Sequence, residues 1–269
     1  MHSDHVVRPE SRPETPASRH FWLGGQGFVV SVEQALQPQR TVRHPAVVLL
    51  TACGRPFRLR GAGCDLITSA AVVAPQCARS LQTDGVLLLS FHVQPHHPAF
   101  SAFAGLAKPI QALRREAFAA ADAAMLRMTE GRSDTAAASA LFEFVVQQAC
   151  AEIGQRAGVR DERIEQALAL LDHDMSLPLP ALADGIGLSD DRLSHLFTEQ
   201  VGLSVRSYRA WRRAAQAWEM FAFDASTSLT ETAHACGFSD SAHLSRCWQH
   251  YYAMSPSRTR DSRYLQVLR

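Results

Sequence analysis

Residues 179–209 read LPALADGIGLSDDRLSHLFTEQVGLSVRSYR, and residues 229–260 read LTETAHACGFSDSAHLSRCWQHYYAMSPSRTR. The two stretches carry the same pattern twice. Gly187 aligns with Gly237, and after one extra residue in the second copy the alignment continues to the end. Repetition of a pattern within one chain indicates a duplicated supersecondary unit, so these stretches determine the fold of the C-terminal part.

Each copy has the sequence pattern of a helix-turn-helix unit. A short helix ends at a glycine, Gly187 or Gly237, where the left-handed conformation costs little. A serine follows, Ser189 or Ser239, and is placed to cap the second helix. That second helix carries an apolar stripe at helical spacing. The stripe residues are Leu193, Leu196, Phe197 and Val201 in the first copy and Leu244, Cys247, Trp248 and Tyr251 in the second.

The pattern predicts the first unit over about 179–201 and the second over about 228–251. Ser228 and Glu231 fit a capping box at the start of the second unit. Between the units, residues 204–223 predict one helix of about 19 residues, near 28 Å long at about 1.5 Å per residue. Such a helix places two recognition helices in successive major-groove faces, about 34 Å apart on one side of B-DNA.

The segment from about Arg163 to Arg260 resembles the DNA-binding domain of AraC-type (AraC/XylS) transcriptional regulators. The matching pieces are LADGIGLSDDRLSHLF, GLSVRSYRAWRRAAQA, and LTETAHACGFSDSAHLSRCW followed by MSPSRTR. This resemblance implies a DNA reader with two helix-turn-helix units behind a variable regulatory domain.

The chain departs from the family pattern at several places. Isoleucine is usual where Thr232 stands, phenylalanine where Leu244 and Trp248 stand, and glycine where Ala253 stands. Lysines commonly follow the aromatic residue of each recognition helix, whereas this chain has the pairs Thr198-Glu199 and Gln249-His250 there. These departures leave the fold intact but remove charge that would bind phosphate.

The residues off each apolar stripe are the predicted DNA-contacting residues. They are Ser241, Ala242, His243, Ser245, Arg246 and Gln249 in the second unit and Asp191, Arg192, Ser194, His195 and Thr198 in the first. Arg246 suits bidentate recognition of guanine O6 and N7. Asp191 repels phosphate but is able to accept from cytosine N4. A solvated helix surface is the alternative interpretation of every one of them.

Further DNA contacts are expected around the helix between the units. Ser204, Ser239 and the Ser255-Pro256 turn begin helices, whose N-termini suit backbone phosphates. Arg209, Arg212 and Arg213 add positive charge, although some of them must hold the helices together. Because phosphate contact dominates DNA affinity, the distribution of charge matters. Residues 160–203 hold three Arg against nine Asp and Glu, a net −6, whereas residues 204–269 hold nine Arg against five, a net +4.

The whole chain of 269 residues suits two domains, and its 46% hydrophobic content suffices for real cores. The six cysteines form no CxxC pair and no zinc-finger spacing. Residues 1–18 are polar and broken by prolines, which predicts a flexible arm. No signal peptide and no apolar run of about 18 residues is present, so a cytoplasmic protein without membrane contact is expected.

Seven short β-rich runs separated by Gly, Pro or Asp-Gly lie between residues 27 and 93, which indicates a small barrel or sandwich. They are GFVVSVE, AVVLLTAC, PFRLRG, CDLITS, AAVVAP, CARSLQT and GVLLLSFHV. Asp84-Gly85 favours a tight hairpin. The order of these runs resembles the cupin-like sensor barrel of the same family. We therefore predict a two-domain α+β fold, with a cupin-like β-barrel and flanking helices followed by an all-α domain.

Two amphipathic, alanine-rich helices are predicted after the barrel, over 109–129 and 134–154, with a hinge at about 154–160. Their apolar faces would pack against each other, the barrel or a second subunit, and the family resemblance favours a homodimer through these helices. The regulatory and dimerisation domain would then span 19–158 and the DNA-binding domain 159–269.

A barrel mouth is a natural pocket for a small molecule. His44, Arg58, Arg60 and Arg79 could line or rim it. Strand alternation puts Arg58 and Arg60 on one face, and it leaves open whether that face is inside or outside. Arg79 also stands where a catalytic cupin would have a late metal-binding histidine, so we expect no metal and no cofactor. His92, His96 and His97 are predicted as loop residues after the barrel rather than metal ligands.

The sequence thus predicts a sequence-specific DNA-binding transcriptional regulator, not an enzyme, controlled by a small-molecule effector. Its expected partners are double-stranded DNA, the effector and, if it activates, RNA polymerase. Two alternatives stay open: a cupin-type metal enzyme with an appended helical domain, and a protein-interaction module that has lost DNA binding.

Overall fold

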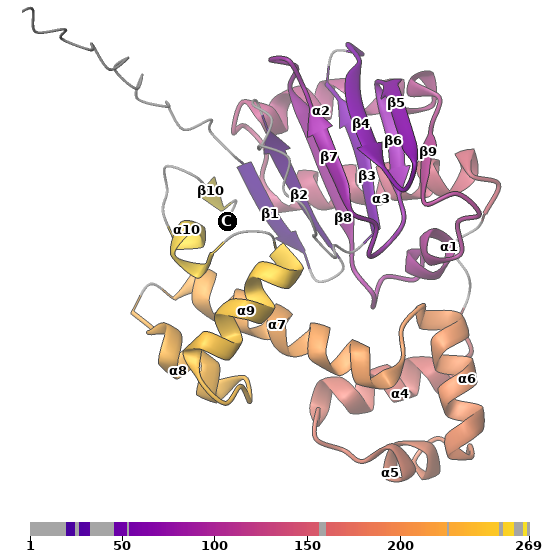
Figure 1. Ribbon diagram of the computed structural model, residues 1–269, viewed down its shortest axis with the longest axis vertical. Coiled ribbons are helices and arrows are strands. Elements are labelled where there is room, and N and C mark those ends of the chain that lie inside the picture. The colour runs from indigo at the N-terminus through magenta and orange to yellow at the C-terminus, as the bar shows by residue number, and fades with distance from the viewer. Residues whose placement is uncertain are drawn as a thin grey trace, which may run out of the picture.

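The computed structural model describes residues 20–24, 27–32, 46–52, 54–155, 160–224, 226–252, 255–260 and 266–267. The chain forms a β region with flanking helices (residues 20–155) and a helical region (residues 160–260), as Figure 1 shows. The predicted α+β organisation in two parts is therefore confirmed. The predicted arm at 1–18 lies outside the described residues. No helix in the described ranges is long and apolar enough to cross a membrane.

The strands form two sheets. A seven-stranded sheet has the order β10-β1-β2-β8-β3-β6-β9, and a three-stranded sheet has the order β5-β4-β7. Their bounds are β1 His20–Gly24, β2 Gly27–Val32, β3 Ala46–Thr51, β4 Phe57–Gly61, β5 Cys64–Thr68, β6 Ala70–Val73, β7 Arg79–Gln82, β8 Leu88–Val93, β9 Ile110–Ala112 and β10 Gln266–Val267. All seven predicted runs are strands, β2 to β8. No pairing joins the two sheets within the described residues, so a closed barrel is not confirmed.

The strands β3, β6 and β8 of the seven-stranded sheet are buried on both faces. Along β8, Leu89, Phe91 and Val93 point to one side and join the core formed with the flanking helices. Residues of the opposite face, such as Val47 and Leu49 of β3, pack against the three-stranded sheet. Together with residues of the three-stranded sheet they form an apolar layer, which we call the inter-sheet layer. Its members are Val47, Leu49, Phe57, Leu59, Ala71, Val73, Cys77, Leu88 and Ile110.

The first helical prediction in this region was wrong at its start. Residues 110–112 form β9, which pairs antiparallel with β6, and a 3-10 helix, η1 (Arg115–Ala121), precedes α2 (Asp122–Thr129). Pairing with the free edge of β6 outweighs the local helix preference of this stretch. The second prediction is confirmed by α3 (Thr135–Glu152), which Asp134 caps. The predicted apolar faces are buried within the chain, except that Leu126 is 41% exposed.

The predicted turn at Asp84-Gly85 is tight, because both residues have positive φ, 48° and 75°. It is not a hairpin, however. The turn joins β7 of the small sheet to β8 of the large one, and those strands pair with other partners. The local sequence determines the turn, whereas non-local packing determines which strands pair.

The helical region contains two cores that share one long helix. The helices are α4 Glu162–His173, α5 Leu179–Asp184, α6 Asp190–Val201, α7 Val205–Phe223, α8 Leu229–Ala235, α9 Ser241–Tyr252 and α10 Pro256–Arg260. Tyr208 and Trp211 of α7 pack with α4, α5 and α6 in the first unit. Trp218 of α7 packs with Trp248 of α9 in the second unit, at a ring-centroid distance of 5.0 Å. The predicted 19-residue linking helix is confirmed.

Local details of the repeat agree with the sequence at all but one point. Gly187 and Gly237 are both left-handed, with φ of 67° and 73°. Ser189 caps α6, and Ser228 forms the predicted capping box with Glu231. The prediction of a serine cap on α9 was wrong, because Asp240 accepts the backbone N–H of His243 at 2.6 Å instead. The extra residue of the second copy precedes this helix and moves the cap from the serine to the aspartate.

Candidate nucleic-acid interface

The helices α6 and α9 present two surfaces that match position by position. We call them the outer faces. The outer face of α6 consists of Asp191, Ser194, His195 and Thr198, and that of α9 consists of Ala242, Ser245, Arg246 and Gln249. Both sets follow helical spacing and lie off the buried stripe, whose members Leu193, Phe197, Leu244 and Trp248 are fully buried. Figure 1 shows the two helices at opposite ends of α7.

On α9, the outer face carries one exposed cation and no acid. Arg246 is exposed, and its guanidinium has no hydrogen bond or ion pair among the described residues. Ala242 and Gln249 are exposed beside it. Asp240, at the helix start, is within reach of the Arg246 charge. The His243 backbone N–H that donates to Asp240 holds the pKa of this carboxyl below its ordinary value, and the charge of Arg246 contributes.

Two of the predicted contact residues on α9 use their side chains for contacts within the chain. The His243 ring is half-buried, edge-on to Phe238 at 5.3 Å, and its Nδ1 lies 3.2 Å from the Ser239 hydroxyl. The Ser245 hydroxyl donates to the Ser241 carbonyl at 2.8 Å. These residues therefore support the helix, and Arg246, Ala242 and Gln249 are the freer part of the surface.

On α6, the outer face is acidic. Asp191, Arg192 and His195 are exposed, and the Thr198 hydroxyl donates to the Ser194 carbonyl at 2.8 Å. Asp190 and Asp191 lie in the first turn, where negative charge stabilises a helix by about 0.3–1 kcal/mol. The two acids thus have a structural reason to be present, whether or not they contact a base.

Many arginines of the helical region hold the domain together. Arg209 donates to the Leu177 carbonyl, and Arg212 pairs with Asp172 at 2.8 Å. Some arginines of α7 were expected to do this. Arg260 was not, yet it donates to carbonyls at the end of α7 and lies 3.5 Å from the Phe221 ring centroid. Three of the nine arginines after residue 204 are therefore engaged within the chain.

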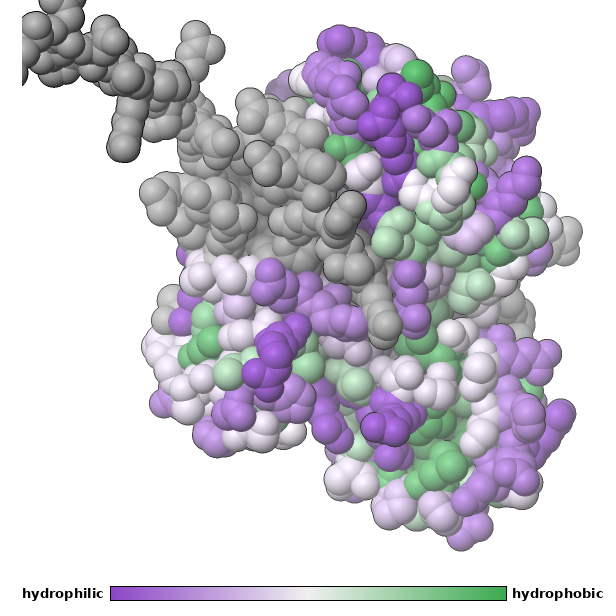
Figure 2. All heavy atoms as spheres, in the orientation of Figure 1, coloured by the Kyte–Doolittle hydropathy of each residue, from purple (hydrophilic) through white to green (hydrophobic). Residues whose placement is uncertain are grey.

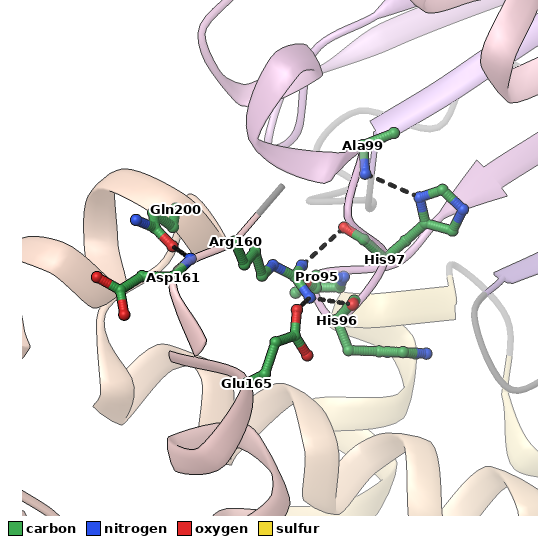
Figure 3. Close-up of polar contacts among 8 residues, drawn as sticks. All are labelled: Pro95, His96, His97, Ala99, Arg160, Asp161, Glu165 and Gln200. Atoms are coloured by element: carbon green, nitrogen blue, oxygen red, sulfur yellow. Dashed lines mark hydrogen bonds and ion pairs between the residues drawn. The ribbon is translucent and has the colours of Figure 1, made fainter. Parts of the chain in front are cut away.

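The β region and the first helical unit meet at a set of polar contacts that we call the junction (Figure 3). Arg160 donates to the carbonyls of His96 at 2.7 Å, His97 at 2.8 Å and Pro95 at 3.2 Å. Its side chain is 3% exposed, and burial lowers its pKa. Glu165 lies 3.4 Å from the same guanidinium. The predicted hinge at 154–160 thus ends in a buried anchor, while residues 156–159 lie outside the described residues.

Further contacts fix the first unit to the β region. The His96 ring stacks on Trp211 of α7 at 5.1 Å, and burial lowers the pKa of His96 to about 3. Gly202, the C-cap of α6, has a φ of 77°, and a Cβ there would lie 3.0 Å from the Phe100 ring. Phe100 belongs to α1 (Phe100–Ala104) of the β region. The end of α6 therefore sits directly on α1.

The predicted loop histidines separate into two groups. His96 and His97 lie in the turn after β8, as predicted. The prediction for His92 was wrong, because His92 is a buried residue within β8, paired in register with Val47 of β3. The alternating faces of a strand carried this information, since His92 follows Leu88 and Ser90 at a spacing of two.

The predicted effector residues are not brought together. His44 lies outside the described residues. Arg58 and Arg60 point outward and pair with Asp65 at 2.7 and 3.1 Å, which lowers the pKa of Asp65 to about 2. Figure 2 shows hydrophilic and hydrophobic residues side by side in the region of the three-stranded sheet, whose outer face also carries Ile67, 66% exposed. Of the three predicted arginines, only Arg79 lies on the inner face of the three-stranded sheet.

Comparison with known proteins identifies the helical region. Residues 182–262 match the family model of a helix-turn-helix domain. The chain is 32% identical over 103 residues to the arabinose operon regulatory protein of Escherichia coli, which covers 37% of this chain and 35% of that protein. Residues 182–262 are a helix-turn-helix domain. The chain is also 28% identical over 113 residues to the transcriptional regulator GbdR of Pseudomonas aeruginosa, covering 41% of this chain and 30% of GbdR.

The chain thus spans about a third of the length of the curated relatives that it matches. A likeness over more of the chain comes from ToxT of Vibrio cholerae, at a TM-score of 0.53 and 11% identity, covering 87% of this chain and 97% of ToxT. At this identity the likeness establishes the fold alone. That ToxT structure contains bound (E)-4-(8-methylnaphthalen-1-yl)but-3-enoic acid.

Proposed function

We propose that this chain is a sequence-specific DNA-binding transcriptional regulator whose β region, within residues 19–158, controls the DNA-binding domain at 159–269 through a small molecule. The observation that carries the proposal is the pair of matching outer faces on α6 and α9, at the two ends of α7. The AraC-type domain and the regulators that it resembles support it.

In this mechanism, α9 enters the major groove with its outer face toward the bases. The Arg246 guanidinium donates to guanine O6 and N7, the Gln249 amide suits adenine, and the Ala242 methyl meets a thymine methyl. The outer face of α6 enters a second groove segment, where Asp191 accepts from cytosine N4. The 19 residues of α7 span about 28 Å at about 1.5 Å per residue, close to the distance between half-sites one duplex turn apart.

Control by a ligand is supported by the junction and by the ToxT likeness. The turn held by Arg160 links the β region to the unit that carries α6, so a change in the sheet reaches a DNA-contacting helix through packed groups. ToxT has the same fold and has been solved with a small organic acid bound. Two facing sheets with an apolar layer are the arrangement that a cupin-like sensor needs. A homodimer, and RNA polymerase at activated promoters, complete the proposed partners.

One observation favours a second function. Residues 160–203 have a net charge of −6, and acidic surface opposes DNA. A protein-interaction module that retains the AraC-type fold is therefore the competing proposal. Selection of random double-stranded DNA by the purified full chain, followed by sequencing, separates the two. We expect an enriched motif, whereas retention of no sequence above background would favour the interaction module.

The selected motif then tests Arg246. Arg246→Ala removes one bidentate base contact, worth about 1–3 kcal/mol, or about 5- to 150-fold in affinity. Fluorescence anisotropy with the selected duplex measures this loss. Arg127→Ala is the matched control, because Arg127 is exposed on α2, in the β region. Equal affinities of the two variants would remove Arg246 from the proposed role.

A further inference from the structure

Arg79 extends from β7 into the inter-sheet layer. Arg79 and Leu81 are two residues apart on one strand, so their side chains share a face, and Leu81 packs against the inter-sheet layer. The Nη1 atom of Arg79 is fully buried and has no hydrogen-bond partner in the part of the chain that the structure describes. Burial lowers the pKa of Arg79 to about 10. The guanidinium of this half-buried residue thus places one N–H group inside the β region without an acceptor.

Other buried arginines of this chain differ from Arg79 in this respect. Arg115 donates to the Thr51 carbonyl and pairs with Asp122. Arg160 donates to three carbonyls, and Arg212 pairs with Asp172. Burying a charge costs several kcal/mol unless it is paired and hydrogen-bonded. The Arg79 guanidinium therefore lacks the counter-charge that its environment demands.

The neighbours of Arg79 do not supply this counter-charge. His92, on the inner face of β8, is close enough that the charge of Arg79, together with burial, keeps its pKa well below the ordinary value. Its ring is therefore neutral. The register partner of Arg79 is Gly61, where an added Cβ would lie 3.1 Å from the Ile110 side chain. A glycine there leaves no side chain on β4 directly beside Arg79. The remaining inner positions are the apolar residues of the inter-sheet layer.

We propose that the inter-sheet layer binds a small monocarboxylate with an apolar body, whose carboxylate pairs with Arg79. The proposal rests on the ligand-controlled function above and names the class of its effector. One unpaired positive charge requires one negative charge, and the planar guanidinium fork fits a carboxylate through two parallel hydrogen bonds. The apolar residues around it, including Val47, Phe57 and Leu59, suit the hydrocarbon part of the ligand.

The position of this site explains how ligand binding would affect the helices proposed to contact DNA. His92 lies two residues before Gln94, and the chain runs on directly into the turn at 95–97. That turn is the one whose carbonyls Arg160 holds at the junction. A carboxylate seated on Arg79 therefore lies near the strand whose end is anchored to the first helical unit.

Isothermal titration calorimetry of the full chain with sodium octanoate and sodium benzoate tests the site, with octanamide as the uncharged control. We expect at least one carboxylate to bind and octanamide to bind at least 10-fold more weakly. In Arg79→Met the same carboxylate should bind at least 10-fold more weakly, whereas Arg60→Met should bind it like the wild type, because Arg60 points outward. Failure of both carboxylates to bind, or equal binding by Arg79→Met, overturns the proposal.

A second measurement separates ligand binding from a purely structural role. Without ligand, Arg79→Met should have a Tm equal to or higher than the wild type, because the substitution removes an unpaired buried charge from an apolar layer. A lower Tm would mean that Arg79 holds the fold and would contradict the proposal. The ligand-binding result does not depend on the DNA selection. If the chain enriches no DNA motif but binds octanoate through Arg79, the proposed DNA-binding function fails while the proposed ligand site stands.

Discussion

Replacing Arg160 by methionine should weaken the junction between the β region and the first helical unit. Methionine keeps much of the apolar stem but leaves the carbonyls of Pro95, His96 and His97, at 2.7 to 3.2 Å from the guanidinium, without their donor. Hydrogen bonds to a charged group contribute about 1.5–3 kcal/mol each. Removal of the buried cation recovers part of its desolvation cost, so we expect a net loss of about 3–5 kcal/mol in the free energy of unfolding.

Urea unfolding followed by tryptophan fluorescence measures this loss, since Trp211 stacks on His96 at the junction. For a slope of about 3 kcal/mol per molar urea, the midpoint of the transition should fall by about 1–1.7 M. Arg163→Met is the matched control. Its guanidinium is 44% exposed and pairs with Asp161 at 2.7 Å, a surface contact that contributes about 0–1 kcal/mol. If Arg160→Met unfolds at the same urea concentration as this control, the junction does not hold the two parts together.

Three further outcomes follow from the helical region. Asp191→Asn removes an exposed acid from the outer face of α6 and should tighten binding to duplexes of any sequence by about 2- to 5-fold, measured by fluorescence anisotropy; unchanged affinity would place that face away from DNA. Ser228→Ala removes half of the capping box and should lower the unfolding free energy by about 1 kcal/mol, seen as a lower Tm, whereas Ser257→Ala serves as an exposed control. Donation by Ser226 and Thr227 lowers the pKa of Asp224 from its ordinary value near 4 to about 2. The stabilisation that the ionised Asp224 gives the fold is therefore complete above pH 4 and is lost as the pH falls toward 2. Asp224→Asn should flatten this part of the pH profile of stability in urea unfolding, and an unchanged profile would contradict this role of Asp224.

Prediction from the sequence was accurate where short-range chemistry decides the structure. The glycines that end α5 and α8, the Ser228 cap and the length of α7 all follow from spacing within a few residues. Even the error at α9 had a visible signal, because the extra residue of the second copy places Asp240 rather than Ser239 before the helix.

Prediction was less accurate where distant parts of the chain decide the structure. Ile110–Ala112 has helical neighbours, but the free edge of β6 makes it a strand. Alternation grouped Arg58 with Arg60, yet only the packing of the second sheet shows that both point outward while Arg79 points inward. Nothing local marked Arg160 as an anchor, because its acceptors lie more than 60 residues earlier in the chain.

The parallel pairing of β10 with β1, seen in Figure 1, has a mechanical consequence. After the second helical unit, the polypeptide returns to the sheet that contains β1. The β region is therefore joined to the first helical unit through Arg160 and to the second through the terminal strand β10. A shift within the β region therefore reaches both helical units, and the distance between α6 and α9 depends on these two links as well as on the length of α7.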